Sequence, residues 1–182
     1  EDAVPADAPG PGPQVVVLAT PHASNLDEFE PLRAAGVALR FARDAASVAA
    51  ADWLLLPGSK HTLADLAWVR AQGLDAAIAA HAAVGRPLLA VCGALQWLGR
   101  MVDDPLGLEG GAPGRAPGLG LLPLDTQFQP SKQLVQARHR LGTLTGPWAP
   151  LAGLAVEGYQ IHLGQTRPAE AGAPVADAVP AQ

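Results

Sequence analysis

The stretch PLLAVCGALQ, residues 87–96, decides the fold and marks a candidate reactive group. Its apolar run over 87–91 predicts a buried strand, and the spacing that follows predicts a helix over Gly93–Val102. Cys92 stands at the junction, in the strand–nucleophile–helix elbow known from hydrolases. A helix N-terminus is expected to lower the pKa of this thiol, and the Gly93 N–H can stabilise an oxyanion. The competing interpretation of Cys92 is a small residue of the hydrophobic core.

Outward from this stretch, the first half of the chain alternates strands with helices. Continuous apolar strands separated by helices predict an α/β fold with a mostly parallel open sheet flanked by helices. Ligands of such sheets bind at the carboxyl ends of strands, so we expect Cys92 at the end of an interior strand. The expected strands are Gln14–Thr20, Val37–Phe41 and Trp53–Leu56, and the expected helices are Asp27–Ala35, with Ser24 or Asn25 as cap, His61–Arg70 and Leu74–Ala83.

The second half of the chain has a different pattern, with apolar runs and no helical spacing between them. Strands are expected at Gly118–Leu124, Gln133–Arg140 and Val156–Leu163. Because no crossover helices separate them, we expect mixed or antiparallel additions at one edge of the parallel sheet.

The amino-acid composition and net charge exclude several classes of protein. The 182 residues are 49% hydrophobic and 16% charged, which supplies a core for one domain and excludes disorder of the whole chain. A net charge of −5 argues against nucleic acid and anionic membrane surfaces as partners, and no apolar run is long enough for a membrane span. A single cysteine excludes an intrachain disulfide, which is consistent with a cytoplasmic location.

Both ends of the chain are rich in Ala, Pro and Gly. We expect residues 1–13 to be a linker, because they are acidic and Pro-rich and have no apolar core of a signal peptide. Residues 14–167 form the expected domain. Residues 168–182 are expected to be a flexible tail, truncated from a longer protein.

Six collinear motifs carry a family resemblance over roughly residues 14–167. Two of them, LPGSKHT at 56–62 and VCGALQWLG at 91–99, resemble the signature stretches of class I-type glutamine amidotransferases, which have a flavodoxin-like fold. The full set is similar to the glutaminase domain of the cobyric acid synthase family. The other four motifs are SNLDEFEPL at 24–32, DPLGLEG at 104–110, GLGLLPLDT at 118–126 and GYQIHLG at 158–164.

The resemblance implies a mechanism and a set of site residues. Cys92 would attack the side-chain amide of glutamine and form a thioester, and ammonia would leave. Gly93 together with the Gly58-Ser59 turn would form the oxyanion hole, and Gln96 would help to hold glutamine, unless it is a solvent-facing helix residue. Ammonia would pass to an N-terminal ATP-dependent synthetase domain of the same polypeptide, which would use ATP and Mg²⁺ to amidate carboxylates of a corrin. No cofactor and no metal are expected in the present domain.

The general base is where the chain departs from the family pattern. Class I enzymes pair the cysteine with a His that is followed two residues later by Glu, whereas His162 is followed by Leu163-Gly164 and preceded by Gln160. His162 is therefore either the base or a family landmark near the site, and a later segment of the GTYLHG type, after Gln182, is the alternative source. The remaining histidines are expected on the surface or in loops, without the spacing of a metal site or dyad: His22, His61, His81 and His139.

Three alternatives stay open at this point. The first is a related amidotransferase, of the cobyrinic acid a,c-diamide synthase or lipid II-amidating type. The second is another hydrolase with a cysteine elbow on the same sheet architecture. The third is a non-catalytic α/β binding module that has lost its base.

Overall fold

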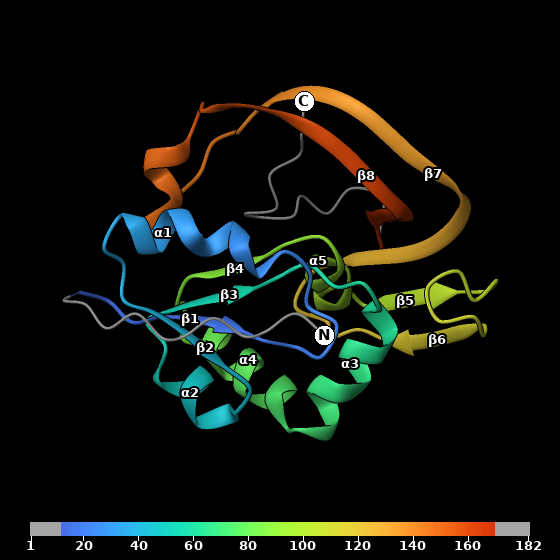
Figure 1. Ribbon diagram of the computed structural model, residues 1–182, viewed down its shortest axis with the longest axis horizontal. Coiled ribbons are helices and arrows are strands. Elements are labelled where there is room, and N and C mark those ends of the chain that lie inside the picture. The colour runs from blue at the N-terminus through green and yellow to red at the C-terminus, as the bar shows by residue number, and fades with distance from the viewer. Residues whose placement is uncertain (1–11, 170–182) are drawn as a thin grey trace.

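The computed structural model describes residues 12–169, which build two four-stranded sheets (Figure 1). The segments expected to be a linker, 1–13, and a tail, 168–182, lie almost wholly outside this range. Within it, the predicted α/β architecture is confirmed: one sheet is parallel and flanked by helices, and the other is mixed. No helix in the described range is long and apolar enough to cross a bilayer.

The first sheet has the strand order β2-β1-β3-β4, and all of its pairs are parallel. Its register places Val15 opposite both Leu39 and Trp53, and Leu54 opposite Leu88. The strands fall within or beside the predicted stretches because each is a short run of apolar, largely buried residues. They are β1 (Val15–Leu18), β2 (Leu39–Ala42), β3 (Trp53–Leu56) and β4 (Leu88–Ala90).

Helices cover both faces of this sheet, and α2, α3 and α4 lie together on one side of it while α1 lies on the other (Figure 1). The expected helix at 27–35 is split into a 3-10 turn and a short helix, and Asn25 makes no side-chain cap bond. A short helix at 45–50, begun by the cap Asp44, was missed. The elements are η1 (Leu26–Phe29), α1 (Glu30–Ala34), α2 (Ala45–Ala50), α3 (Thr62–Ala71), α4 (Leu74–Ala83) and α5 (Gly93–Leu98).

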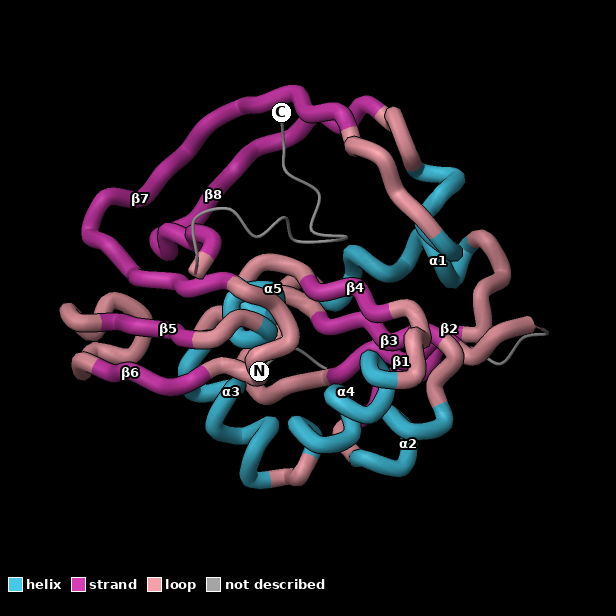
Figure 2. Tube along the Cα trace, turned by 180° about the vertical axis from the view of Figure 1, so that it is seen from behind, coloured by secondary structure: helices cyan, strands magenta, loops and turns pink. Residues whose placement is uncertain are grey.

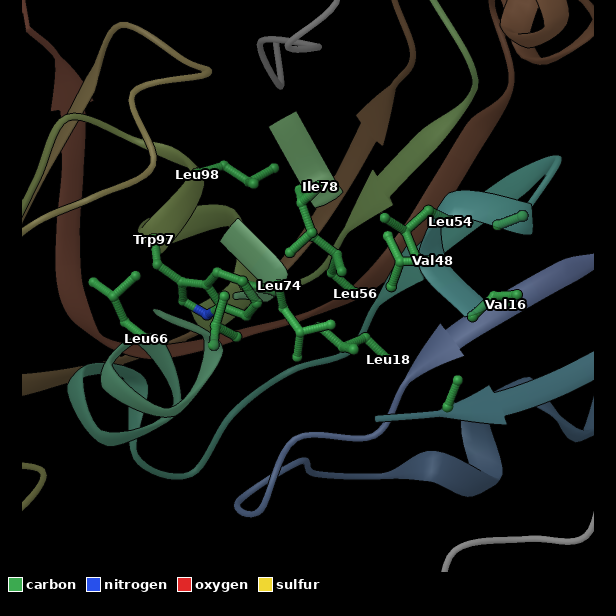
Figure 3. Packing of buried hydrophobic residues seen from close by; sticks show 14 of the residues in the cluster. Val16, Leu18, Val48, Leu54, Leu56, Leu66, Leu74, Ile78, Trp97 and Leu98 are labelled. Carbon is green, nitrogen blue, oxygen red and sulfur yellow. The ribbon is translucent and has the colours of Figure 1, made fainter. Parts of the chain in front are cut away.

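The core has two parts because successive strand residues point to opposite faces. Along β1, Val16 and Leu18 face the larger cluster, whereas Val15 and Val17 face the smaller one. Figure 3 shows the larger cluster, in which side chains of β1 and β3 meet those of the helices and Trp97 is fully buried. Burial on both faces explains why these strands read as continuous apolar runs.

The second sheet has the order β6-β5-β7-β8, with one parallel pair, β5 with β7. The predicted strands at 133–140 and 156–163 are confirmed as parts of longer strands, which pair antiparallel with a register shift between Phe128 and Gln133. Together β7 and β8 form a curved ribbon that arches over the first sheet (Figures 1 and 2), and Trp148, between the two strands, meets Trp53 of β3 edge to face. The elements are β5 (Met101–Asp104), β6 (Gly114–Pro117), β7 (Leu124–Arg140), η2 (Gly146–Leu151) and β8 (Ala155–Pro168).

Four expectations about the fold were wrong. The mixed or antiparallel strands, expected at one edge of the parallel sheet, form a second sheet of their own. The helix expected over 93–102 ends at Leu98, and the chain turns through Gly99 into β5. The expected strand at 118–124 is mostly turns, where Leu119, Leu121 and Leu122 donate to backbone carbonyls in and beside α5. Finally, β4 is not an interior strand: it is the last strand of its sheet in the described range, and Leu89 on it is 42% exposed.

Candidate active site

Cys92 occupies a sharp elbow between β4 and α5. Its φ of 51° and ψ of −115° place it in a region that residues with a side chain rarely adopt, and only Asn25 shares a positive φ among the non-glycine residues described. Such strain persists where the surrounding structure enforces it, and it is common at active sites. The elbow turns the Cys92 side chain outward, where it is exposed to solvent. The prediction of a strand–cysteine–helix junction is confirmed, and the alternative of a core cysteine is not.

The surroundings of the thiol raise its pKa above the ordinary value. Although the residue is exposed, neighbouring protein atoms partly desolvate the sulfur, and this desolvation is the largest cause. A hydrogen bond from the Gly93 backbone N–H lowers the pKa, but the negative charges of Glu109 and Glu28 raise it further. The expectation of a thiol acidified by the helix N-terminus was therefore wrong in its net direction. The surroundings of Cys92 therefore disfavour the thiolate.

The Gly58-Ser59 turn after β3 lies directly against the elbow. A Cβ atom added to Gly58 would lie 3.5 Å from the Cys92 Cβ, and one added to Gly93 would lie 3.3 Å from the Ser59 backbone nitrogen. These contacts leave no room for a side chain at Gly93, which would also meet the Thr62 Oγ1 at 2.9 Å. The three residues expected to share one oxyanion hole are thus brought together.

A buried carboxylate on α3 holds this turn. Asp65 is 0% exposed and accepts hydrogen bonds from the Thr20 hydroxyl at 2.8 Å and the Ser59 hydroxyl at 2.7 Å. Its other oxygen accepts from the His22 backbone N–H at 3.1 Å and lies 3.0 Å from the His22 Nδ1. Asp65 therefore joins the loop after β1 to the loop after β3.

A second buried polar group links α3 to α5. Thr62, the first residue of α3, donates its backbone N–H to Glu109 at 2.9 Å and its hydroxyl to the same carboxylate at 2.7 Å. Its hydroxyl also lies 3.4 Å from the Gln96 Oε1. Asp104 anchors the Glu109 loop by accepting the backbone N–H groups of Leu108 and Glu109. Desolvation raises the pKa of Glu109, and the Thr62 bonds oppose that rise.

Gln96 is not the solvent-facing residue that one interpretation allowed. It is 7% exposed, and its amide nitrogen would lie 2.6 Å from a Cβ added to Gly164 on β8. Its side chain is therefore packed between Thr62 and β8, one helical turn after Cys92. Any contact of Gln96 with a substrate has to be made from this buried position.

His162 lies on β8, two residues before Gly164, and its backbone pairs with Gln133 of β7. The side chain of His162 falls outside the described part of the chain, so its role stays a prediction. His22 and His61 lie in loops, as expected, and their rings meet edge to face at 4.9 Å between centroids. His81, expected on the surface, is buried on α4 and its Nε2 lies 3.0 Å from the Pro87 carbonyl oxygen.

Sequence reasoning missed Thr62 and Asp65 and treated Glu109 only as part of a motif. A signal for the first two was present: residues 62, 65, 66 and 69 share one helix face, and all four are buried. Two polar side chains on an otherwise apolar stripe require buried partners, which here are Glu109, Ser59, Thr20 and His22. The identity of those partners depends on loop contacts across 6 to 47 residues of chain.

The open parallel sheet and the strained cysteine elbow define an α/β protein of the glutamine amidotransferase type. A crystal structure of a glutamine amidotransferase has the same fold, with a TM-score of 0.57 over 82% of this chain and 70% of that one at 16% identity. The chain belongs to the CobB/CobQ-like glutamine amidotransferase domain family, whose sequence profile matches residues 14–180.

Among the curated relatives of this chain within that family are cobyric acid synthases. The chain is 51% identical over 168 residues to the cobyric acid synthase of a Polaromonas species, across 92% of this chain and 32% of the relative. It is 55% identical over 154 residues to that of an Acidovorax species, across 84% and 30%. It is 54% identical over 166 residues to that of Leptothrix cholodnii, across 87% and 32%. The chain thus spans about a third of the length of these relatives.

Proposed function

We propose that this chain is the glutaminase part of a cobyric acid synthase and that Cys92 is its nucleophile. The observation that carries the proposal is the strained, exposed elbow at Cys92 with the Gly58-Ser59 turn packed against Gly93. Identity of 51–55% to cobyric acid synthases favours this activity over the related amidotransferases. A cysteine at positive φ strains the backbone, and such strain is found mostly at functional sites. The strain at Cys92 therefore argues against a non-catalytic module.

The proposed reaction has two steps. The Cys92 sulfur attacks the side-chain amide carbon of glutamine, its proton passes through a base to the leaving nitrogen, and ammonia departs as the thioester forms. Water then attacks the thioester, which releases glutamate and restores the thiol. Backbone N–H groups of Gly93 and of the Gly58-Ser59 turn stabilise the tetrahedral oxyanion in both steps.

The raised pKa of Cys92 makes a general base necessary. His162 is our proposed base within this chain, because β8 passes beside Gln96 at Gly164, two residues further along. A His on a GTYLHG-type segment, which the family resemblance implies, is the competing candidate. Gln96 is proposed to orient glutamine through its buried amide, since it lies one helical turn after Cys92.

The released ammonia is proposed to reach a synthetase domain elsewhere in the polypeptide, where ATP with Mg²⁺ activates corrin carboxylates. The chain spans about a third of its curated relatives, which leaves room for such a domain in them. Within residues 12–169, no three His, Cys, Asp or Glu side chains gather as a metal site.

Cys92→Ser in the full-length polypeptide tests the proposal. Glutamine-dependent amidation should fall by several orders of magnitude, whereas ammonia-dependent amidation should be unchanged, because the two reactions differ only in nitrogen source. Trapping with a glutamine-analogue diazoketone should label wild type at Cys92. Equal loss of both reactions, or wild type that the analogue does not label, would contradict the assignment.

A further inference from the structure

Asp65 is a buried charge that the reaction above does not use. It is fully buried on the first turn of α3, and its carboxylate receives hydrogen bonds from the Thr20 and Ser59 hydroxyls and the His22 backbone. A buried carboxylate is tolerated only when its oxygens are well satisfied. Here one oxygen accepts from two hydroxyls, and the other accepts from the His22 N–H and lies beside the His22 Nδ1. The first turn of a helix also favours negative charge.

The partners of Asp65 lie in two loops that are already joined by backbone hydrogen bonds. Ser24 donates to the Gly58 carbonyl at 2.8 Å and Lys60 donates to the His22 carbonyl at 2.9 Å. Ala23 and Ser59 form the bridge between these two bonds. Asp65 accepts a hydrogen bond from a hydroxyl of each loop, Thr20 in one and Ser59 in the other. It therefore fixes the position of Ser59 relative to the loop after β1.

Ser59 transmits that position to the elbow. Its hydroxyl donates to Asp65 at 2.7 Å and accepts the His61 N–H at 3.0 Å, which fixes the turn on both sides. Its backbone nitrogen and Cβ lie 3.3 Å and 3.0 Å from the point that a Cβ on Gly93 would occupy. A shift of the Ser59 turn would therefore move one half of the oxyanion site relative to Cys92.

We infer that Asp65 is a positioning residue for glutamine hydrolysis, which holds the Gly58-Ser59 turn at the distance from Cys92-Gly93 that oxyanion stabilisation requires. The inference rests on the proposed function. Donor N–H groups act at 2.7–3.1 Å from the oxyanion, so a displacement of about 1 Å costs up to about 100-fold in rate. Because the oxyanion develops only as the tetrahedral species forms and is absent from bound glutamine, the loss falls on kcat rather than on KM.

Asp44 provides a matched control. It is also a carboxylate that accepts from a backbone N–H and a hydroxyl, at 2.8 Å each, but both belong to Ser47 in the same helix turn. Asp44→Asn therefore makes the same chemical change at a group that serves only α2. The comparison controls for the loss of one carboxylate charge, and the ammonia-dependent reaction reports any general loss of folded protein.

The experiment uses the full-length polypeptide, with glutamate release and ammonia-dependent amidation measured in parallel. Asp65→Asn should lower kcat for glutamine at least about tenfold with little change in KM, and should leave the ammonia reaction at the level of Asp44→Asn. Ser59→Ala, which removes the hydroxyl and both of its hydrogen bonds, should also lower kcat. The combined variant should lose less than the product of the two single effects, because both act through one contact.

Three results would overturn the inference. Asp65→Asn with the kcat of Asp44→Asn would make Asp65 structural only. Fully independent effects of Asp65→Asn and Ser59→Ala would show that Asp65 does not act through the turn. Wild type that amidates with ammonia but releases no glutamate from glutamine would remove the proposed function first, and the positioning role with it.

Discussion

At the scale of single residues, the site pairs a strained cysteine with a local environment that disfavours its thiolate. Desolvation and the carboxylates of Glu109 and Glu28 outweigh the Gly93 N–H in setting the pKa of Cys92. A neutral resting thiol is protected from oxidation and alkylation, since the thiolate is the reactive form. Reactivity then depends on a base that takes the proton when substrate is bound.

Glu109→Gln is expected to lower the pKa of Cys92. The change removes one negative charge near the sulfur, and the new amide can still accept the Thr62 N–H and meet the Thr62 hydroxyl. The pH profile of iodoacetamide alkylation should move to lower pH, so alkylation at pH 8 becomes faster. The shift of the profile should be partial, because desolvation, the largest cause of the raised Cys92 pKa, is unchanged in the variant.

Glu157→Gln is the control for that experiment. Glu157 is exposed on β8, where it accepts from the Gln136 amide, and it does not contribute to the pKa of Cys92. Its removal lowers the net negative charge equally and should leave the alkylation profile in place. A profile that moves equally in both variants, or that moves to higher pH in Glu109→Gln, would contradict the local electrostatic account.

At the scale of elements, α3 is the platform of the site. Its buried face carries Thr62 and Asp65 as well as Leu66 and Val69, so the same helix fills the core and fixes two loops. The cap of α3 comes from Glu109, far along the chain, and not from the preceding His61. The DPLGLEG motif around Glu109 thus has a structural reason: it closes the N-terminus of the helix that carries Asp65.

Element types were largely predictable, and their ends and partners were not. The strand at 53–56 and the helix at 74–83 match the structure residue for residue, because apolar period and flanking Pro or Gly set both limits. Val102 was assigned to a helix, since the run after Gly93 remains apolar, but Gly99 ends the helix and pairing with β7 makes a strand. Strand pairing is a non-local choice that local sequence does not encode.

The Asp44 cap gives a pH-dependent prediction for α2. The Ser47 N–H and hydroxyl hold the pKa of Asp44 below its ordinary value. This stabilisation is fully present above the unfolded pKa of about 3.9 and is lost as the pH falls through the lower, folded value. Asp44→Ala should therefore cost about 1 kcal/mol at neutral pH, seen as faster hydrogen exchange of the α2 amides, and the difference from wild type should shrink below pH of about 4.

Asp44→Asn is the matched variant for that measurement. Asn caps helices about as well as Asp but does not titrate, so protection of α2 should stay near wild type at neutral pH. The ratio of α2 amide protection in the variant to that in wild type should then rise as the pH falls. A constant ratio for both variants over the whole pH range would show that the Asp44 charge contributes nothing to α2.

At the scale of the whole molecule, the strand that leads to Cys92 is an edge strand of its sheet in the described range. In the described range β4 has a partner only in β3, and Leu89 on it is 42% exposed. The chain also spans about a third of its curated relatives. The elbow and the Gly58-Ser59 turn lie together within the chain. The oxyanion role of that turn, the base and the destination of ammonia are proposals.

The final prediction is that the 182-residue chain hydrolyses glutamine poorly compared with the full-length polypeptide. The Cys92 thiol has a raised pKa, and Gly164 stands two residues after His162, at the position where the class I pattern has a Glu. Loss of one member of a catalytic triad commonly costs about 10³-fold or more, with residual activity from binding and the oxyanion hole. Contact with the proposed synthetase domain is a second requirement that the 182-residue chain alone does not meet, because closure on a partner domain can complete an active site.

The measurement is glutamate release by the short chain, by a chain extended through the next GTYLHG-type segment, and by the full-length polypeptide at equal concentration. We expect low turnover by the short chain and a large gain on extension, with Cys92→Ser inactive in every length. His162→Ala in the extended chain distinguishes the two sources of the base, because it should have little effect if the later segment supplies it. Robust turnover by the short chain that His162→Ala abolishes would instead assign the base to His162 and make the missing +2 carboxylate dispensable.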